Sequence, residues 1–499
     1  MDLTALPRLF GAAFALVRAD ALAPREIDPL LPPAARALAR ASRVFAGRQA
    51  RDGRPGERLA RVLERQGPVA VKLGQLLSTR GDIFGAIFAE DLSRLKDQLP
   101  PFPTSVAKAE VERALGRPLG SLFAEFGEPV AAASLAQVHP ARLLDGREVA
   151  VKLLRPGVEA RVAADARALR LGGAWAQRWI PGAQRLEPRA FAATIVRALQ
   201  LELDLRFEAA GADELREVMA HDGFMSAPRV VWEGVNKRVL TLDWAAGKPL
   251  SDTGALAGAR DRPRIAASLI RGFLAQALDH GVFHADLHEG NLFVDGRGRI
   301  TAVDFGIVGR LGAPERRYLA EILWGFIQRD YARVADTHFS AGYVPAHHDR
   351  AAFAQALRAV GEPIFGRTAQ DVSMSRLLTQ LFDITALFDM RLRPELVLLQ
   401  KTMVTVEGVG RRIDPELDIW AAAEPVVRRW ITRELSPGRR LRALAIEAAD
   451  TLARIADAAE TRVEERQEAR ARGAGLDFAS LALGALIAAA AFGAGLLLR

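Results

Sequence analysis

Residues 283–306 read FHADLHEGNLFVDGRGRITAVDFG, and this stretch decides the fold that we expect. Asp286 is followed five positions later by Asn291, and Asp304 opens an Asp-Phe-Gly triplet. Between Asn291 and Asp304, two short apolar runs flank the turn residues Asp-Gly-Arg-Gly at 295–298. Apolar runs around such a turn predict a β-hairpin. The hairpin would place Asn291, before its first strand, and Asp304, after its second strand, at the same end.

These residue types at this spacing are typical of phosphoryl transfer. The transferred group carries spread negative charge, so the protein must supply Mg²⁺, held by carboxylate and amide oxygens, and a carboxylate that orients the acceptor. In the protein-kinase signature the loop Asp is the base, while the Asn and the Asp of Asp-Phe-Gly hold the metal. The sequence therefore predicts Asp286 as a catalytic residue, Asn291 and Asp304 as metal ligands, and ATP and Mg²⁺ as cofactors.

His284 and His288 are four residues apart, which would also place two imidazoles on one helical face for a zinc ion. The chain has no cysteine, and no third ligand is evident nearby. We therefore favour histidines that brace the loop by hydrogen bonds.

Lys152 ends the alternating run Glu-Val-Ala-Val-Lys at 148–152. Such a strand lysine pairs with the ATP α- and β-phosphates and is held by a helix glutamate. A glycine-rich loop should precede it, yet residues 129–139 read PVAAASLAQVH. Alanine has less backbone freedom than glycine and crowds phosphate oxygens. The sequence thus predicts an atypical kinase.

The chain resembles the UbiB family of atypical kinase-like proteins, which support ubiquinone biosynthesis. The family's alanine-rich loop matches Ala131 to Ser134, its Lys-x-Gly-Gln signature matches residues 72–75, and its Glu-x-Asp signature matches residues 202–204. The resemblance runs from about residue 60 to about residue 425.

The resemblance implies two ion pairs. Lys152 would contact nucleotide phosphate and pair with Glu208, and Lys72 would lie over the active site and pair with Glu202, in a helical extension that blocks the groove for a protein substrate. The alternative for these residues is a solvated helix face. The implied ATP-binding residues are Ala131, Ala132, Ala133, Ser134, Val138, Lys152 and Glu208, and the implied catalytic residues are Asp286, Lys72 and Glu202.

Four positions depart from the family pattern. Leu287 and Glu289 stand where prolines are usual, Gly211 replaces a common Asn, and Gly81 replaces a common Pro. None of them removes a predicted metal ligand or phosphate contact.

Length, net charge and cysteine content limit the number of domains and the kinds of partner that we expect. The 499 residues suffice for two to four compact units. Lys and Arg (68) exceed Asp and Glu (60) by 8, which suits an anionic partner. No basic cluster is interleaved with aromatic residues, so we expect no nucleic acid. The absence of cysteine excludes disulfides, and a membrane surface is the favoured partner.

Residues 478–498 contain no charged residue, and their only polar side chain is Ser480. A helix of this length reaches about 31 Å, close to the hydrocarbon core of a bilayer. Arginines precede the segment at 462, 466, 470 and 472 and only Arg499 follows it, which predicts a single-pass protein of a bacterial-type inner membrane with its kinase-like part in the cytoplasm. A buried soluble helix is the alternative. Small residues in the segment predict a homodimer or docking on another membrane protein.

We expect an α+β, bilobal protein-kinase-like fold with an N-terminal helical extension and one C-terminal transmembrane helix. The predicted domains are a helical segment ending in the exposed linker 48–57 (1–57), a helical extension (58–125), the N-lobe (126–247), the C-lobe (248–425), a juxtamembrane segment (426–473) and the membrane anchor (474–499). No signal peptide is predicted at the N-terminus.

Together these features predict a membrane-anchored atypical kinase or ATPase of the UbiB type that uses Mg²⁺-ATP in ubiquinone (coenzyme Q) biosynthesis. It would handle a membrane lipid or a prenylated quinone precursor, or organise the ubiquinone-biosynthesis enzymes. The alternatives are a small-molecule or protein kinase with another acceptor, and a nucleotide-binding scaffold without turnover.

Overall fold

The structure is a computed structural model. It describes residues 5–30, 33–47, 52–78, 85–93, 95, 100–179, 187–259, 261–362, 384, 387–390 and 394–434. The chain divides into two compact units, Met1–Glu424 and Pro425–Arg499, and of the second only the end of helix α17 (Ile419–Glu434) is described. None of the helices in these ranges combines the length and the apolar character needed to cross a bilayer. The predicted span at 478–498 lies outside the described residues.

A five-stranded antiparallel sheet forms the N-lobe, with the order β1-β3-β4-β5 and with β2 paired to β3. Its strands are β1 (Phe123–Phe126), β2 (Ala131–Ala132), β3 (Ala136–Leu143), β4 (Glu148–Leu154) and β5 (Val239–Asp243). Residues alternate along β4, so Val149, Val151 and Leu153 are buried on one face. The other face carries Lys152.

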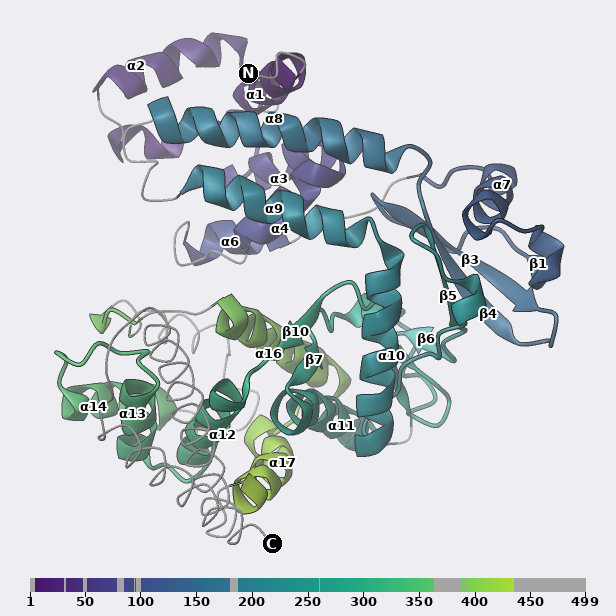
Figure 1. Ribbon diagram of the computed structural model, residues 1–499. Coiled ribbons are helices and arrows are strands. Elements are labelled where there is room, and N and C mark those ends of the chain that lie inside the picture. The colour runs from purple at the N-terminus through teal and green to yellow at the C-terminus, as the bar shows by residue number, and fades with distance from the viewer. Residues whose placement is uncertain are drawn as a thin grey trace, which may run out of the picture. The chain divides into compact units, whose positions relative to one another are not determined.

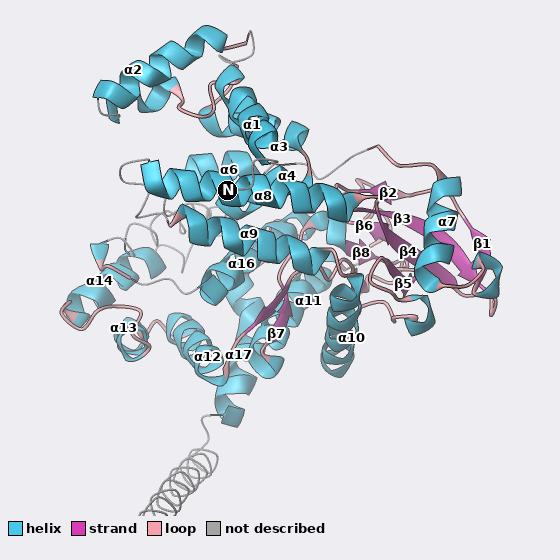
Figure 2. Ribbon diagram, turned by 45° about the horizontal axis from the view of Figure 1, so that its top comes forward, coloured by secondary structure: helices cyan, strands magenta, loops and turns pink. Residues whose placement is uncertain are grey.

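Helix α7 (Thr104–Leu115) covers the apolar face of this sheet, as Figure 2 shows. Its Ala107 and Val111 share one buried core with Val149 and Val151. The sheet begins at Phe123, ahead of the predicted start of the N-lobe at residue 126, and α7 packs on the sheet although the sequence placed it in the helical extension.

In the described part of the connection from β4 to β5, the α-helices are α8 (Val158–Trp179), α9 (Pro188–Glu202) and α10 (Leu205–Asp222). Helices α8 and α9 run side by side, and α10 continues from the end of α9 toward the C-lobe (Figure 1). The break between α9 and α10 follows from Asp204, whose side chain accepts a hydrogen bond from Arg206 N and caps α10.

Among the described residues ahead of α7, the α-helices are α1 (Leu6–Arg18), α2 (Pro33–Ser42), α3 (Pro55–Gln66), α4 (Pro68–Ser78) and α6 (Ala86–Ser93). Helices α3, α4 and α6 share a core around Leu63, Leu92 and Leu95, and α4 packs on α9. The prediction of an exposed linker over 48–57 is wrong at its end, because α3 begins at Pro55 and buries Gly56.

The C-lobe combines short strands with helices. Its strands are β6 (Lys248–Pro249), β7 (Val282–His284), β8 (Leu292–Val294), β9 (Ile300–Ala302) and β10 (Val308–Arg310). Its described helices include α11 (Arg262–Ala275), the π-helical turn η8 (Gln276–His280), the 3-10 turn η9 (Glu289–Asn291), α12 (Ala313–Ile327), α13 (Tyr331–Ser340), α14 (Arg350–Gly361) and α16 (Pro394–Ile413). Helix α16 packs on α11, and its Thr402 hydroxyl donates to Ala285 O at 3.0 Å, beside the predicted catalytic loop.

Candidate functional site

The predicted hairpin is present. Strands β8 and β9 pair antiparallel, with Leu292 opposite Ala302. One step beyond this pair, Val303 N donates to Asn291 O at 2.9 Å. The two predicted metal ligands, Asn291 and Asp304, therefore flank the same end of the hairpin.

His284 braces the loop that carries Asp286. Its Nδ1 accepts a hydrogen bond from Asp286 N at 3.1 Å, and its Nε2 lies 3.1 Å from Val303 O, to which it donates. Burial lowers the pKa of His284, which favours this neutral imidazole. Both ring nitrogens are used, so the bracing role predicted for His284 is confirmed and a zinc ion shared with His288 is excluded. The Asn291 amide adds a further brace, because Nδ2 donates to Asp286 O at 3.0 Å.

Lys152 joins two acidic residues that are distant in sequence. Its Nζ lies 2.7 Å from Glu208 Oε1 and 3.2 Å from Asp304 Oδ1. The Glu208 side chain is 8% exposed and the Lys152 side chain 22%, while Asp304 is half exposed. Val138 is the cross-strand partner of Lys152 on β3, so both side chains share the face of the sheet opposite to α7. The pair expected between Lys152 and Glu208 is thus present.

The three charges shift one another's pKa values. The Lys152 ammonium lowers the pKa of Asp304 to about 2, against the effect of burial. Burial opposes the charge of Lys152, but the Asp304 and Glu208 carboxylates outweigh it and raise the pKa of Lys152. Burial raises the pKa of Glu208 to about 7, because the nearby lysine offsets the loss of solvation only in part and Asp304 adds a repelling charge. Lys152 and Asp304 are therefore charged at neutral pH, and Glu208 is the weak acid of the group.

The Asp304 backbone has φ +62°, a left-handed conformation that few residues other than glycine adopt. Aspartate tolerates it because its short carboxylate can bond nearby backbone, and here Gly306 N donates to Asp304 Oδ1 at 3.4 Å. This left-handed turn places the carboxylate beside Lys152.

Lys72 and Glu202 form the second expected ion pair. Lys72 comes from α4 and Glu202 is the last residue of α9, with side chains 12% and 22% exposed. The Glu202 charge also contributes, after burial, to the raised pKa of Glu208, so the two lysine–glutamate pairs are neighbours. Gly74 of the same motif permits this placement, because a Cβ there would strike Leu63 and Leu95. These side chains are partly buried rather than solvated.

The alanine-rich loop comprises strand β2 and the start of the turn that leads to β3. Ala133 N donates to Ala136 O at 2.8 Å, and none of the three alanines at 131–133 has a positive φ, so alanine is unstrained here. Arg155 Nε donates to Ala133 O at 2.7 Å and holds the turn from β4. Gln137, which is buried, bonds the backbone of Phe102 through both amide atoms. Sequence reasoning missed Arg155 and Gln137, since no motif marks them.

The departures from the family pattern have structural explanations where they are described. Leu287 is fully buried, and Glu289 forms an ion pair with Arg412 of α16. At Gly211, a Cβ would lie 3.0 Å from Val308 Cγ2, so glycine lets α10 approach the segment after Asp304. Gly81 lies outside the described residues.

The donor set suits a hard divalent cation. Within the described ranges, no protein group donates a hydrogen bond to Asn291 Oδ1 or to Asp304 Oδ2. Carboxylate and amide oxygens are ligands that Mg²⁺ accepts, usually together with water and substrate phosphates. The residues present therefore fit a magnesium ion.

Comparisons with known proteins agree with this geometry. The ABC1 atypical kinase-like domain matches residues 94–338, and the UbiB helical domain matches residues 357–418. The solved structure of the Mycobacterium tuberculosis protein Rv3197 in complex with erythromycin is similar, with 25% sequence identity over 73% of this chain and 93% of that chain and a TM-score of 0.54. Fold and site thus define an atypical protein-kinase-like protein. The chain belongs to the UbiB family, whose kinase-like and helical domains both match it.

Proposed function

We propose that this protein is a membrane-anchored atypical kinase or ATPase that uses Mg²⁺-ATP to support ubiquinone biosynthesis. The observation that carries the nucleotide chemistry is the contact of Lys152 with both Glu208 and Asp304. A lysine fixed in this way is a positive charge already oriented for ATP phosphates, so little reorganisation is needed when nucleotide binds.

Each residue has a distinct task in this proposal. Glu208 orients the Lys152 ammonium toward the α- and β-phosphates. Asn291 and Asp304 hold Mg²⁺, which when bound neutralises charge on the phosphate oxygens. Asp286, whose backbone is held by His284 and Asn291, orients the acceptor hydroxyl or water and takes its proton. The alanine turn and Val138 line the nucleotide side of the sheet.

The link to membranes and quinones rests on the sequence and the family. The apolar residues 478–498 and the preceding arginines support a single-pass protein of the inner membrane with its kinase-like part in the cytoplasm. A membrane lipid or a prenylated quinone precursor is the proposed ligand, and ubiquinone-biosynthesis enzymes or a second copy of the chain are the proposed partners.

Lys72 and Glu202 favour hydrolysis or a small acceptor over a protein substrate. Their ion pair ties the helical extension to the end of α9, next to Glu208 and Lys152. In this position the extension would obstruct a docking protein.

The test is Mg²⁺-ATP hydrolysis by the purified full-length protein in cardiolipin-containing liposomes, with and without a phenolic mimic of a quinone precursor. We expect turnover that the mimic stimulates and that Asp304→Asn abolishes, with the fold intact by circular dichroism. Unchanged hydrolysis in Asp304→Asn would refute the metal assignment. Tight nucleotide binding without turnover would favour a scaffold, and phosphorylation of another acceptor would favour a kinase outside this pathway.

A further inference from the structure

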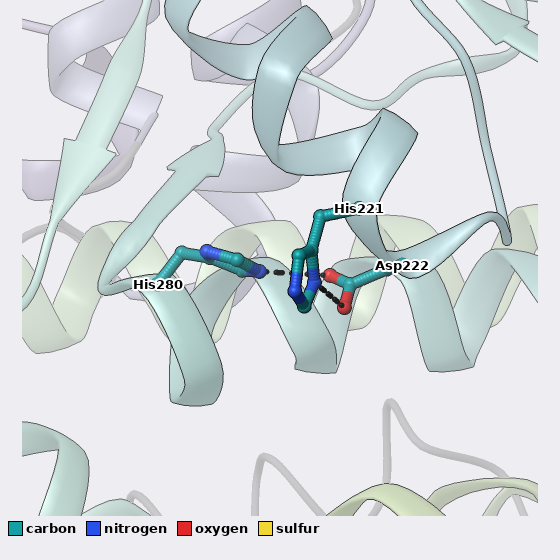
Figure 3. A group of neighbouring side chains, drawn as sticks. All are labelled: His221, Asp222 and His280. Atoms are coloured by element: carbon teal, nitrogen blue, oxygen red, sulfur yellow. Dashed lines mark hydrogen bonds and ion pairs between the residues drawn. The ribbon is translucent and has the colours of Figure 1, made fainter.

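Two histidines and an aspartate meet away from the nucleotide site. His221 and Asp222 are the last two residues of α10, and His280 is the last residue of η8 (Figure 3). His280 Nε2 lies 3.2 Å from Asp222 Oδ2, and His221 Nδ1 lies 3.5 Å from Asp222 Oδ1. One ligand atom from each residue lies within 4.8 Å of the others.

Two buried atoms of this cluster make no hydrogen bond within the described part of the chain. The Asp222 side chain is 6% exposed, and its Oδ2 makes no hydrogen bond with any residue that the structure describes. His280 Nε2 is also buried without one, although it faces Asp222 Oδ2. Burying polar groups without hydrogen bonds is unfavourable, and most such groups in native proteins have a partner or bind an ion. The two atoms form an ion pair when His280 is protonated, and without that proton two lone pairs face each other at 3.2 Å.

The spacing suits a shared metal ion. Zinc binds imidazole nitrogen and carboxylate oxygen at about 2.0–2.2 Å, so two ligands of a tetrahedral site lie about 3.3 Å apart. The separation of His280 Nε2 from Asp222 Oδ2 is close to this value. Imidazole nitrogen is also a ligand that favours zinc over magnesium or calcium.

The C-terminal ends of two helices lie at this cluster, and their electrostatic field favours a bound cation. Helix α10 is capped by Gly223 and η8 by Gly281, the residues that follow them, with left-handed backbones of φ +71° and +70°. The carbonyl ends of helices carry partial negative charge and stabilise cations nearby. The cluster lies where both helices present this end.

We propose that His221, Asp222 and His280 bind a divalent transition-metal ion of the zinc class, with a water molecule in the fourth position. The ion would join the end of α10 to the turn that leads through β7 into the predicted catalytic loop. Helix α10 carries Glu208 in its first turn. In kinases, the position of the helix whose glutamate pairs with the strand lysine controls phosphoryl transfer. In this protein that helix is α10, so a metal bound at its far end would stabilise the arrangement of Lys152 and Glu208.

The composition of the chain makes this site testable. The chain has eight histidines and no cysteine, and all eight lie in the described ranges. In those ranges, a second group with the same ligand types, His347, His348 and Asp389, provides a matched control, because its aspartate is 69% exposed and well hydrated whereas Asp222 is 6% exposed. Its His347 is as exposed as His221, with side chains 69% and 76% exposed.

The experiment is zinc binding by the metal-free full-length protein in detergent, measured by equilibrium dialysis and elemental analysis. Excess Mg²⁺ is present so that Asn291 and Asp304 do not take up zinc. We expect one tightly bound zinc ion per chain, a loss of at least about tenfold in affinity in His221→Gln, and loss of the site in His280→Gln. His347→Gln should bind zinc as the wild type does.

A second measurement separates metal binding from effects on folding. Zinc should slow amide hydrogen exchange at the end of α10 and in η8 of the wild type and His347→Gln, but not of His221→Gln. His221 is exposed, so this variant is informative even if His280→Gln does not fold. Absence of tight zinc binding, equal binding in His221→Gln, or loss only in His347→Gln would overturn the proposal.

Discussion

Replacing Lys152 with methionine removes the cation that contacts both Glu208 and Asp304, and the resulting loss of stability should depend on pH. Removing one partner of a buried ion pair costs about 3–5 kcal/mol. Glu208 is 8% exposed but Lys152 is 22% exposed, and Glu208 can take up a proton, so we expect a smaller loss of about 2–3 kcal/mol above pH 7.

The sign follows from the pKa of Glu208, which is raised from 4.5 to about 7 in the folded protein. A carboxyl group with a raised pKa keeps its proton in the folded state, so its contribution to stability falls as the pH rises from about 4.5 to about 7. Without Lys152 the pKa of Glu208 rises further, and this fall extends to higher pH. The difference between the wild type and Lys152→Met should therefore be smaller at about pH 6, where the lost contact with the half-exposed Asp304 carboxylate remains, and largest at about pH 8.5, where Glu208 is also affected.

The assay is thermal unfolding of the full-length proteins in detergent at both pH values. At about 2 °C per kcal/mol, Lys152→Met should lower Tm by about 4–6 °C at the higher pH. Glu208→Gln keeps the shape of the glutamate without its charge, so the double variant should regain most of the loss. An equal loss at both pH values, or a double variant as unstable as Lys152→Met at high pH, would refute this reasoning.

Three further predictions concern other parts of the chain. Gly247→Ala should lower the stability by about 2–4 kcal/mol in thermal unfolding, because φ is +93° and a Cβ would strike the Val294 carbonyl, whereas Gly258→Ala, with open space around it, should have little effect. Lys72→Ala should change ATP turnover or autophosphorylation while Tm stays within about 2 °C, since its partner Glu202 keeps access to water; unchanged activity would leave Lys72 with a packing role only. Removal of residues 474–499 should release the protein from membranes in a flotation assay, and a truncated chain that still floats would show another anchor.

The local features of the site were predictable from sequence. The hairpin between Asn291 and Asp304 follows from two apolar runs and a turn, and the strand that presents Lys152 follows from alternating residues. In both cases the decisive residues are near neighbours, so backbone geometry alone sets their relation.

The partners of these residues were not predictable in the same way. Glu208 is 56 residues from Lys152 and Glu202 is 130 residues from Lys72, and only the family resemblance indicated these pairs. The contact of Arg155 with the alanine turn and the ion pair of Glu289 with Arg412 had no signal in the sequence.

The sequence by itself determined the kinase-like loop, the strand lysine, the charged and apolar pattern of the chain and its family. Only the tertiary structure decided that α7 belongs to the N-lobe sheet, that Glu208 rather than Asp304 is the weak acid beside Lys152, and that His280 meets His221 and Asp222. The physical reason is that strands, turns and caps depend on residues a few positions apart, whereas burial, pKa values and side-chain clusters depend on packing between segments distant along the chain.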